Sequence, residues 1–204
     1  MEKKRGQLIV ISGPSGVGKG TVCKVLLSRN PNMRFSVSAT TRAIRPGEIE
    51  GVHYFYITQA EFDAMIERDE FLEYMKVFGM NSYGTPKAFV EEQRSQGMDI
   101  VLDIDVQGGM RVKEVAPDAI MIFIAPPDQE ELKARLVGRG TETPEAIERR
   151  LATASGELAC IPLYDYIVLN DEVEKAAAAI EAIVAAERCR VTRNGELIEK
   201  LQQR

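Results

Sequence analysis

Residues 13–21 combine glycines, a lysine and hydroxyls at a spacing that suits phosphate binding. Gly13, Gly18 and Lys19 occupy the positions that define a P-loop. Glycines let backbone N–H groups approach phosphate oxygens without a side-chain clash, and the N-terminus of a following helix adds positive charge. A strand-to-helix turn that binds nothing is the alternative, and Lys19 argues against it. We predict a nucleoside triphosphate site formed by Gly13, Pro14, Ser15, Gly16, Val17, Gly18, Lys19, Gly20 and Thr21.

The loop departs from the usual pattern at the metal-binding position. Gly20 stands where a P-loop usually carries Ser or Thr, and the hydroxyl comes one residue later, at Thr21. Mg²⁺ commonly keeps several water ligands in nucleotide sites. We therefore expect phosphates and water to hold the ion, with Thr21 and Asp103 contacting it through water.

Two carboxylates, Asp103 and Asp105, lie at the end of the apolar segment 99–104. In a parallel α/β sheet this end of the strand faces the phosphate loop. Their spacing puts both side chains on one face of the strand, so both can point toward the site. The alternative, for either residue, is a cap on the next helix.

Arg42 and Arg45 lie three residues apart, just after a predicted strand. Guanidinium groups bind phosphate through two parallel hydrogen bonds, so the pair suits a second phosphate. Taken alone, the segment could equally be a solvated basic turn.

The composition limits the class of protein. The chain has 204 residues, 45% of them hydrophobic, and a net charge of −5. This balance argues against a general nucleic-acid binder, although it allows a small anionic ligand. The three cysteines form no C-x-x-C pair, and no apolar run suits a signal peptide or a membrane span. We expect a cytoplasmic protein that binds neither nucleic acid nor membrane, and the sequence leaves its oligomeric state open.

Alternating strands and helices predict an α/β fold with a parallel central sheet. Strands are expected at 8–11, 35–38, 99–104, 119–125 and 166–169. Helices are expected at 19–29, 58–68 with a capping box, 86–96 before Gly97, 128–139 before Gly140, from Pro144 after Thr143, and 172–190.

The segment from about 38 to 89 interrupts this alternation. It is rich in Tyr and Phe, and residues 54–57 and 70–78 favour short strands. We predict a three-layer P-loop fold with this inserted α+β subdomain and a helical lid. The expected boundaries are 1–37 core, 38–90 inserted subdomain, 91–127 core, 128–156 lid, 157–190 core and 191–204 a loose charged tail.

Several further stretches resemble the guanylate kinase family. They run in the family's order over nearly the whole chain, from about Gln7 to Glu187. The matching stretches are 13–19, 36–42, 45–48, 51–54, 71–73, 83–85, 102–108, 123–127, 138–143 and 167–171. The resemblance implies transfer of the γ-phosphoryl group of ATP to GMP, with Mg²⁺, and a 38–90 subdomain that binds GMP.

The resemblance also implies roles at matching positions. The GMP phosphate would be held by Arg42, Arg45, Tyr54 and Tyr83. Guanine would be held by Ser38, Glu73, Thr85 and Asp105, with Asp103 close by. The transferred group would meet Lys19, Arg42, Arg135, Arg139 and Arg150, and the adenine would lie near Asn170. The carboxylates suit guanine, because its N1–H and amino group are adjacent donors whereas adenine N1 is an acceptor.

The arginines of segment 128–156 differ in their local partners. Glu131 precedes Arg135 by four residues, which predicts a helix ion pair. Arg139 and Arg150 have no acidic residue at that spacing, so they are the better candidates for a ligand anion.

Three other functions fit parts of the pattern. A GTPase switch would explain the D-x-x-G at 105–108, but no N-K-x-D or T-K-x-D motif occurs. A guanylate-kinase-like binding module without activity would not need the retained Lys19, Arg42 and Arg45. A kinase for another monophosphate such as AMP is disfavoured by Glu73 and Asp105.

Overall fold

The structure, a computed structural model, describes residues 4–77, 81–137 and 144–203. The chain divides into two compact units. The first consists of Met1–Gly13 and Pro31–Met121, and the second consists of Pro14–Asn30 and Ile122–Arg204. The P-loop crosses from one to the other between Gly13 and Pro14.

Three parallel strands of the central sheet lie in the first unit, in the order β2 (Met33–Phe35), β7 (Asp99–Asp103) and β1 (Leu8–Ser12). The first four residues of β1 are fully buried, as their unbroken apolar sequence predicts for a central parallel strand. Helices α3 (Lys87–Ser95) and α4 (Val106–Val115) contact these strands. Strand β7 ends at Asp103, and the chain then turns into α4.

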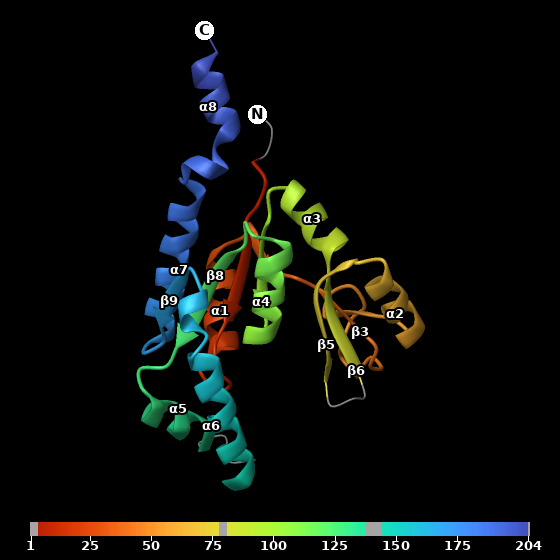
Figure 1. Cartoon of the computed structure of the whole chain (residues 1–204), viewed down its shortest axis with the longest axis vertical. Helices are drawn as coiled ribbons and strands as arrows, with labels where there is room; N and C mark the ends of the chain where they lie inside the picture. Colours follow the sequence, from red (N-terminus) through yellow and green to blue (C-terminus); the bar gives the residue numbers. More distant parts are fainter. Residues whose placement is uncertain (1–3, 78–80, 138–143, 204) are drawn as a thin grey trace. The chain divides into compact units, whose positions relative to one another are not determined.

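The inserted subdomain has its own four-stranded sheet. Its order is β4 (Tyr54–Tyr56), β3 (Ser38–Thr40), β6 (Asn81–Pro86) and β5 (Phe71–Val77). Helix α2 (Gln59–Glu67) begins with the predicted capping box between Thr58 and Glu61 and packs on this sheet (Figure 1). Phe62 and Phe71 stack with their ring centroids 4.6 Å apart and form the centre of a separate apolar core.

One predicted strand is wrong. The segment 35–38 is two strand ends, because β2 stops at Phe35 and β3 starts at Ser38 in a different sheet. Ser36 donates its N–H to Val101, whereas Ala39 pairs with Gly84. The chain therefore leaves the central sheet and enters the subdomain within two residues.

The second unit contains β8 (Ile120–Ala125), which starts in the first unit, paired in parallel with β9 (Tyr166–Leu169). Helices α1 (Lys19–Arg29) and α7 (Val173–Arg188) pack together, and α5 (Gln129–Val137) contacts α6 (Pro144–Leu158). A short turn, η1 (Ile161–Leu163), precedes β9. The predicted end of the fifth helix at Gly140 lies outside the described residues. Over the described residues, no helix has the length and apolar character needed to cross a membrane.

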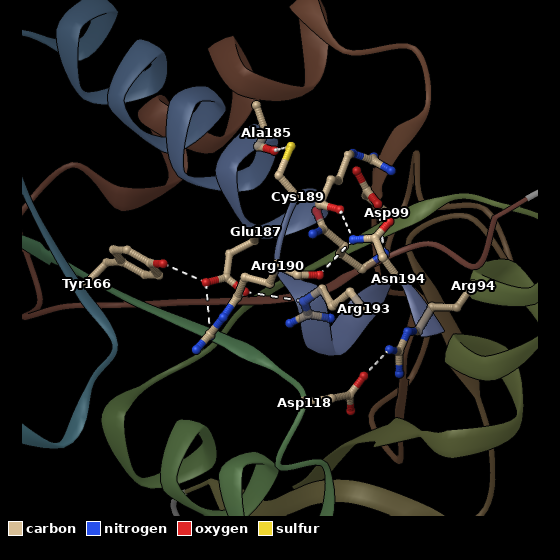
Figure 2. Close-up of polar contacts among 12 residues, drawn as sticks. Arg94, Asp99, Asp118, Tyr166, Ala185, Glu187, Cys189, Arg190, Arg193 and Asn194 are labelled. Atoms are coloured by element: carbon tan, nitrogen blue, oxygen red, sulfur yellow. Dashed lines mark hydrogen bonds and ion pairs between the residues drawn. The ribbon is translucent and has the colours of Figure 1, made fainter. Parts of the chain in front are cut away.

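The C-terminal residues are folded, which corrects the prediction of a loose tail. The turn η2 (Val191–Arg193) and α8 (Gly195–Gln202) follow α7 (Figure 1). Glu187 accepts hydrogen bonds from Arg190 at 3.2 Å and Arg193 at 3.3 Å (Figure 2). The amide of Asn194 donates to the carbonyls of Arg188 and Arg190. These contacts join the tail to the end of α7.

Candidate active site

The phosphate loop of the second unit has the backbone of an anion cradle. Gly16 and Gly18 have φ of 89° and 92°, a left-handed conformation that favours glycine. Lys19 is the first residue of α1, and the carbonyl of Gly18 accepts from Thr21 and Val22. The N-terminus of α1 therefore starts inside the loop, where its amides can bind phosphate oxygens.

Side chains from α5 pack against the loop. A Cβ added at Gly16 would lie 2.7 Å from Leu136 Cδ2 and 3.6 Å from Leu132 Cδ1. Leu132 and Leu136 are themselves buried. The glycine at position 16 is therefore required by its backbone conformation and by the close approach of α5.

Arg135 and Asn170 both bind the carbonyl oxygen of Val17. Arg135 Nη1 lies 3.1 Å from it and Asn170 Nδ2 lies 2.7 Å from it. Arg135 also donates to the Asn170 carbonyl at 3.1 Å and to Glu131 at 2.9 Å. The helix ion pair predicted for Arg135 is confirmed, whereas its contacts to the loop have no signature in the local sequence pattern.

The other cationic residues predicted for the ATP site of the second unit differ in position. Arg150 Nη1 lies 3.4 Å from the Ser15 hydroxyl, which brings it beside the loop. Arg139 lies outside the described residues. Thr21 is exposed at the start of α1 and Lys19 is half-buried.

The first unit holds a buried carboxylate, Glu73, at 7% exposure on β5. The Thr85 hydroxyl donates to it at 2.6 Å. Burial raises the pKa of Glu73 above its ordinary value, and the charge of Asp105 acts in the same direction, whereas the Thr85 hydrogen bond and the charge of Arg111 oppose the rise. Glu73 is therefore a strong hydrogen-bond acceptor that water barely reaches.

Asp105 lies close to Glu73, but not as a strand residue. It caps α4, where its carboxylate accepts from the Gly108 amide at 2.8 Å. The prediction that both aspartates follow strand alternation is wrong, since β7 ends at Asp103. A Cβ added at Gly108 would lie 3.4 Å from Glu73 Oε2 and 3.5 Å from Asp105 Oδ1, so both carboxylates approach the same glycine.

Arg42 is held by a carboxylate that the sequence analysis did not assign. Its guanidinium donates to both oxygens of Glu48, at 2.7 and 2.6 Å, and Tyr56 donates to Glu48 at 2.8 Å. These hydrogen bonds, that of Arg42 first, hold the pKa of Glu48 well below its ordinary value despite partial burial. The segment 45–48 was part of the family pattern, so the only available signal for Glu48 was its match to that pattern.

Aromatic rings surround Arg42. Its guanidinium carbon lies 4.9 Å from the centre of the Tyr54 ring, and the Tyr54 and Tyr83 rings are 5.9 Å apart. A hydrogen bond with Tyr83 adds to that of Glu48 in raising the pKa of Arg42. The structure therefore brings together Arg42, Tyr54 and Tyr83, while Arg45 is exposed.

A cavity of about 390 Å³ opens in the first unit beside these groups. Its lining includes four predicted site residues, Ser38, Tyr54, Thr85 and Asp103. Ser36 also lines it, and its buried hydroxyl has no hydrogen-bond partner among the described residues. The volume falls in the range of small-molecule sites, roughly 300–1,000 Å³.

The chain is similar to proteins named guanylate kinase. A family model for guanylate kinase matches residues 5–187. The guanylate kinase of Symbiobacterium thermophilum is 49% identical over 203 residues, which is 99% of this chain and 96% of that protein. That of Halalkalibacterium halodurans is 51% identical over 100% of this chain and 98% of its own. A crystal structure of guanylate kinase from Anaplasma phagocytophilum superposes with a TM-score of 0.76 at 36% identity, and covers 100% of this chain and 97% of that one.

Proposed function

The chain belongs to the guanylate kinase family, and on that premise we propose how its residues perform the family's reaction. The protein is an ATP:GMP phosphotransferase, which converts ATP and GMP into ADP and GDP. The observation that best supports guanine as the acceptor base is the buried Glu73 carboxylate next to Thr85 and Asp105.

GMP binds in the first unit. Glu73 and Asp105 accept from guanine N1–H and its amino group, and Ser38 and Thr85 complete the base site. Arg42, Arg45, Tyr54 and Tyr83 bind the monophosphate. Arg42 is already fixed between Glu48 and the Tyr54 ring, so little side-chain entropy is lost when phosphate binds.

ATP binds in the second unit. The amides of the loop and Lys19 hold the β- and γ-phosphates, and Arg150 lies beside Ser15 to meet the transferred group. We assign Arg139 the same role from the sequence pattern. The buried Oδ1 of Asn170 has no partner among the described residues, and the amino group of adenine would supply a donor for it.

The donor set fits Mg²⁺ held through water. Thr21 and Asp103 are exposed oxygen donors, and the described residues contain no cluster of three or more His, Cys, Asp or Glu that could hold a metal. This pattern suits an ion that takes most of its ligands from phosphates and water. When bound, Mg²⁺ neutralises charge on the phosphates.

The chemistry needs positioning and charge neutralisation. A phosphate oxygen of GMP forms a bond to the γ-phosphorus, and the bond between that phosphorus and the leaving oxygen of ADP breaks. The attacking oxygen is already anionic, so no general base is needed. Lys19 and the arginines stabilise the charge that spreads over the transferred group.

A coupled assay of ADP release tests the function, with ATP and either GMP, AMP, UMP or no acceptor. We expect turnover with GMP alone. Equal turnover with AMP would contradict the role of Glu73 and Asp105. Turnover without an acceptor would favour a GTPase-like switch, and none at all would favour a binding module.

Lys19→Met tests the assignment of Lys19 to the ATP site. We expect kcat to fall by roughly 10³-fold, because one positioned cation on the transferred phosphoryl group is lost. GMP affinity, measured by titration calorimetry, should stay within about twofold of the unmodified protein. A comparable loss of GMP affinity would mean that Lys19 contributes to GMP binding, which contradicts its assignment to ATP.

We also propose that the protein works in the cytoplasm. Cys23, Cys160 and Cys189 form no disulfide bond within the described part of the chain, as is usual in a reducing compartment. Fractionation of the source cells with an antibody to this chain would test the assignment.

A further inference from the structure

We propose that Arg135 and Asn170 are positioning residues that fix the Val17–Gly18 peptide so that the Gly18 N–H faces the bound triphosphate. The inference rests on the proposed ATP site. In it, both residues contact the backbone of the loop rather than the nucleotide itself. Arg135 would then act through the loop, and Asn170 would affect every triphosphate rather than adenine alone.

The geometry of one carbonyl carries the proposal. Val17 O accepts from Asn170 Nδ2 at 2.7 Å and from Arg135 Nη1 at 3.1 Å, so both of its lone pairs are used. Arg135 Nη2 also donates to Asn170 O at 3.1 Å, which ties the two residues to each other. The three contacts determine the side of the loop to which this carbonyl points.

Because the peptide group is planar, fixing the Val17 carbonyl also fixes the direction of the Gly18 N–H. In a trans peptide the C=O and the N–H point in opposite directions, and the described chain has no cis peptide bond. Val17 O points toward Arg135 and Asn170, so the Gly18 N–H points away from them. This amide donates to no other described residue. It is therefore available to a phosphate oxygen.

The close approach of Asn170 to the loop is also seen at Gly18. A Cβ added there would lie 2.7 Å from Asn170 Nδ2, closer than a Cβ atom can approach. Gly18 is thus required by its φ of 92° and by the position of the Asn170 amide. Asn170 is itself only 2% exposed, so its amide is held in place by the surrounding protein.

Helix α5 positions Arg135. Asp128 caps the helix by accepting from the Glu131 amide at 2.7 Å, and Glu131 accepts from Arg135 Nε at 2.9 Å. Leu132 and Leu136 pack against Gly16 on the same side of the loop. Arg135 is held by its ion pair with Glu131 on a helix that packs against the loop, which limits the positions that its planar fork can take toward Val17.

Inorganic tripolyphosphate separates this role from contact with adenine, since it has no base. We expect Arg135→Ala to weaken ATP and tripolyphosphate binding by the same factor, roughly three- to tenfold for a lost hydrogen bond. Asn170→Ala should weaken tripolyphosphate binding by a similar factor, and ATP binding at least as much, because the adenine contact is lost as well. Arg135→Lys should restore part of the loss, because an ammonium can reach only one of the two carbonyls. GMP affinity should not change.

Two further measurements keep the test decisive. Glu131→Gln, which removes the ion pair but leaves both carbonyl contacts, should weaken tripolyphosphate binding less than Arg135→Ala does. In ¹⁵N spectra, tripolyphosphate should move the Gly18 amide proton downfield, and the shift should shrink in Asn170→Ala. Tripolyphosphate binding needs no GMP, so these measurements test the loop contacts independently of the kinase activity.

Three outcomes would overturn the proposal. ATP affinity could fall in Asn170→Ala while tripolyphosphate affinity stays constant, which would make Asn170 an adenine contact only. GMP affinity could fall by the same factor as tripolyphosphate affinity, which would indicate general damage to the fold. The Gly18 amide could shift equally in both proteins, which would show that the loop orients itself without these residues.

Discussion

Glu73 is buried, which favours its protonated form, but it must be ionised to accept hydrogen bonds from guanine. Burial raises its pKa, yet guanine needs an acceptor, which is the ionised form. Guanine binding and proton release are therefore linked. At a pH well above the raised pKa the carboxylate is charged and ready to accept. As the pH falls through that pKa, a proton takes the place of the guanine donor and affinity decreases.

We predict that guanosine affinity decreases about tenfold per pH unit once the pH is below the pKa of Glu73, which lies above its ordinary value of 4.5. Guanosine is the right ligand, because GMP has a phosphate that titrates near pH 6. Glu73→Gln should bind guanosine about 100-fold more weakly at neutral pH and with little pH dependence. Calorimetric titrations from neutral pH down to about pH 4 would measure both. An unmodified protein whose affinity stayed constant down to the lower end of that range would contradict the assignment.

At the scale of elements, strand β6 positions Tyr83 and Thr85 on either side of a buried glycine. A Cβ added at Gly84 would lie 2.8 Å from Phe71 Cδ1 and 3.1 Å from Tyr74 Cβ. We predict that Gly84→Ala destabilises the protein by about 1–3 kcal/mol, since a rigid ring and a neighbouring strand must move. GMP affinity should fall with it, because both site residues move with the strand. ATP affinity should change little.

The chain offers a matched control for that substitution. Gly156 lies in helix α6 with no atom within 4 Å of an added Cβ. Gly156→Ala should stabilise the protein by about 1 kcal/mol through helix propensity alone. Thermal melts and GMP titrations of both variants would check the pair. If Gly84→Ala had no greater effect than Gly156→Ala, the packing of β6 against β5 would not explain the site geometry.

Helix α7 ends on a buried carboxylate. Glu187 is 2% exposed and accepts from Tyr166 at 2.6 Å as well as from Arg190 and Arg193 (Figure 2). Burial alone would raise the pKa of Glu187, but the Tyr166 hydrogen bond and the two arginines outweigh it, so the pKa lies below 4.5. A lowered pKa in the folded state stabilises the protein above the unfolded pKa, and this contribution is lost as pH falls through the folded value.

We predict that Glu187→Gln lowers the free energy of unfolding by about 2 kcal/mol at neutral pH. The difference from the unmodified protein should shrink below about pH 4.5 and vanish in stronger acid, because both side chains are then uncharged. Urea unfolding at several pH values would measure it. A difference that stayed constant with pH would assign the loss to packing instead of charge.

The elements of the fold could be predicted from local patterns to different extents. The apolar run at 8–11 and the capping box at Thr58 each contain their own signal, and both predictions are confirmed. The change of sheet between Phe35 and Ser38 has none, because an extended segment looks the same in either sheet. The contact of Arg135 with Val17 joins residues 118 positions apart, so only the folded chain reveals it. Glu48 was missed since its pairing with Arg42 depends on the shape of one turn.

At the scale of the whole molecule, the two compact units divide the proposed nucleotide contacts between them. The proposed contacts to GMP come from Pro31–Met121, and most of those to ATP come from Pro14–Asn30 and Ile122–Arg204. Phosphoryl transfer needs the reacting atoms within roughly 3–3.5 Å of each other. Water at the γ-phosphorus would compete with GMP and hydrolyse ATP. The reaction therefore favours a chain that closes only when both nucleotides are present.

We predict that the inserted subdomain and the lid, 38–90 and 128–156, close over both nucleotides. The radius of gyration from small-angle X-ray scattering should be smaller with a bisubstrate analogue that links adenosine and guanosine through phosphates. ADP alone or GMP alone should produce only part of that change, because each engages one set of contacts. ATP hydrolysis without GMP should remain far slower than GDP formation for the same reason. An unchanged radius of gyration with the bisubstrate analogue would mean that the site is closed before the nucleotides bind, and water would then have to be excluded by residues already in place.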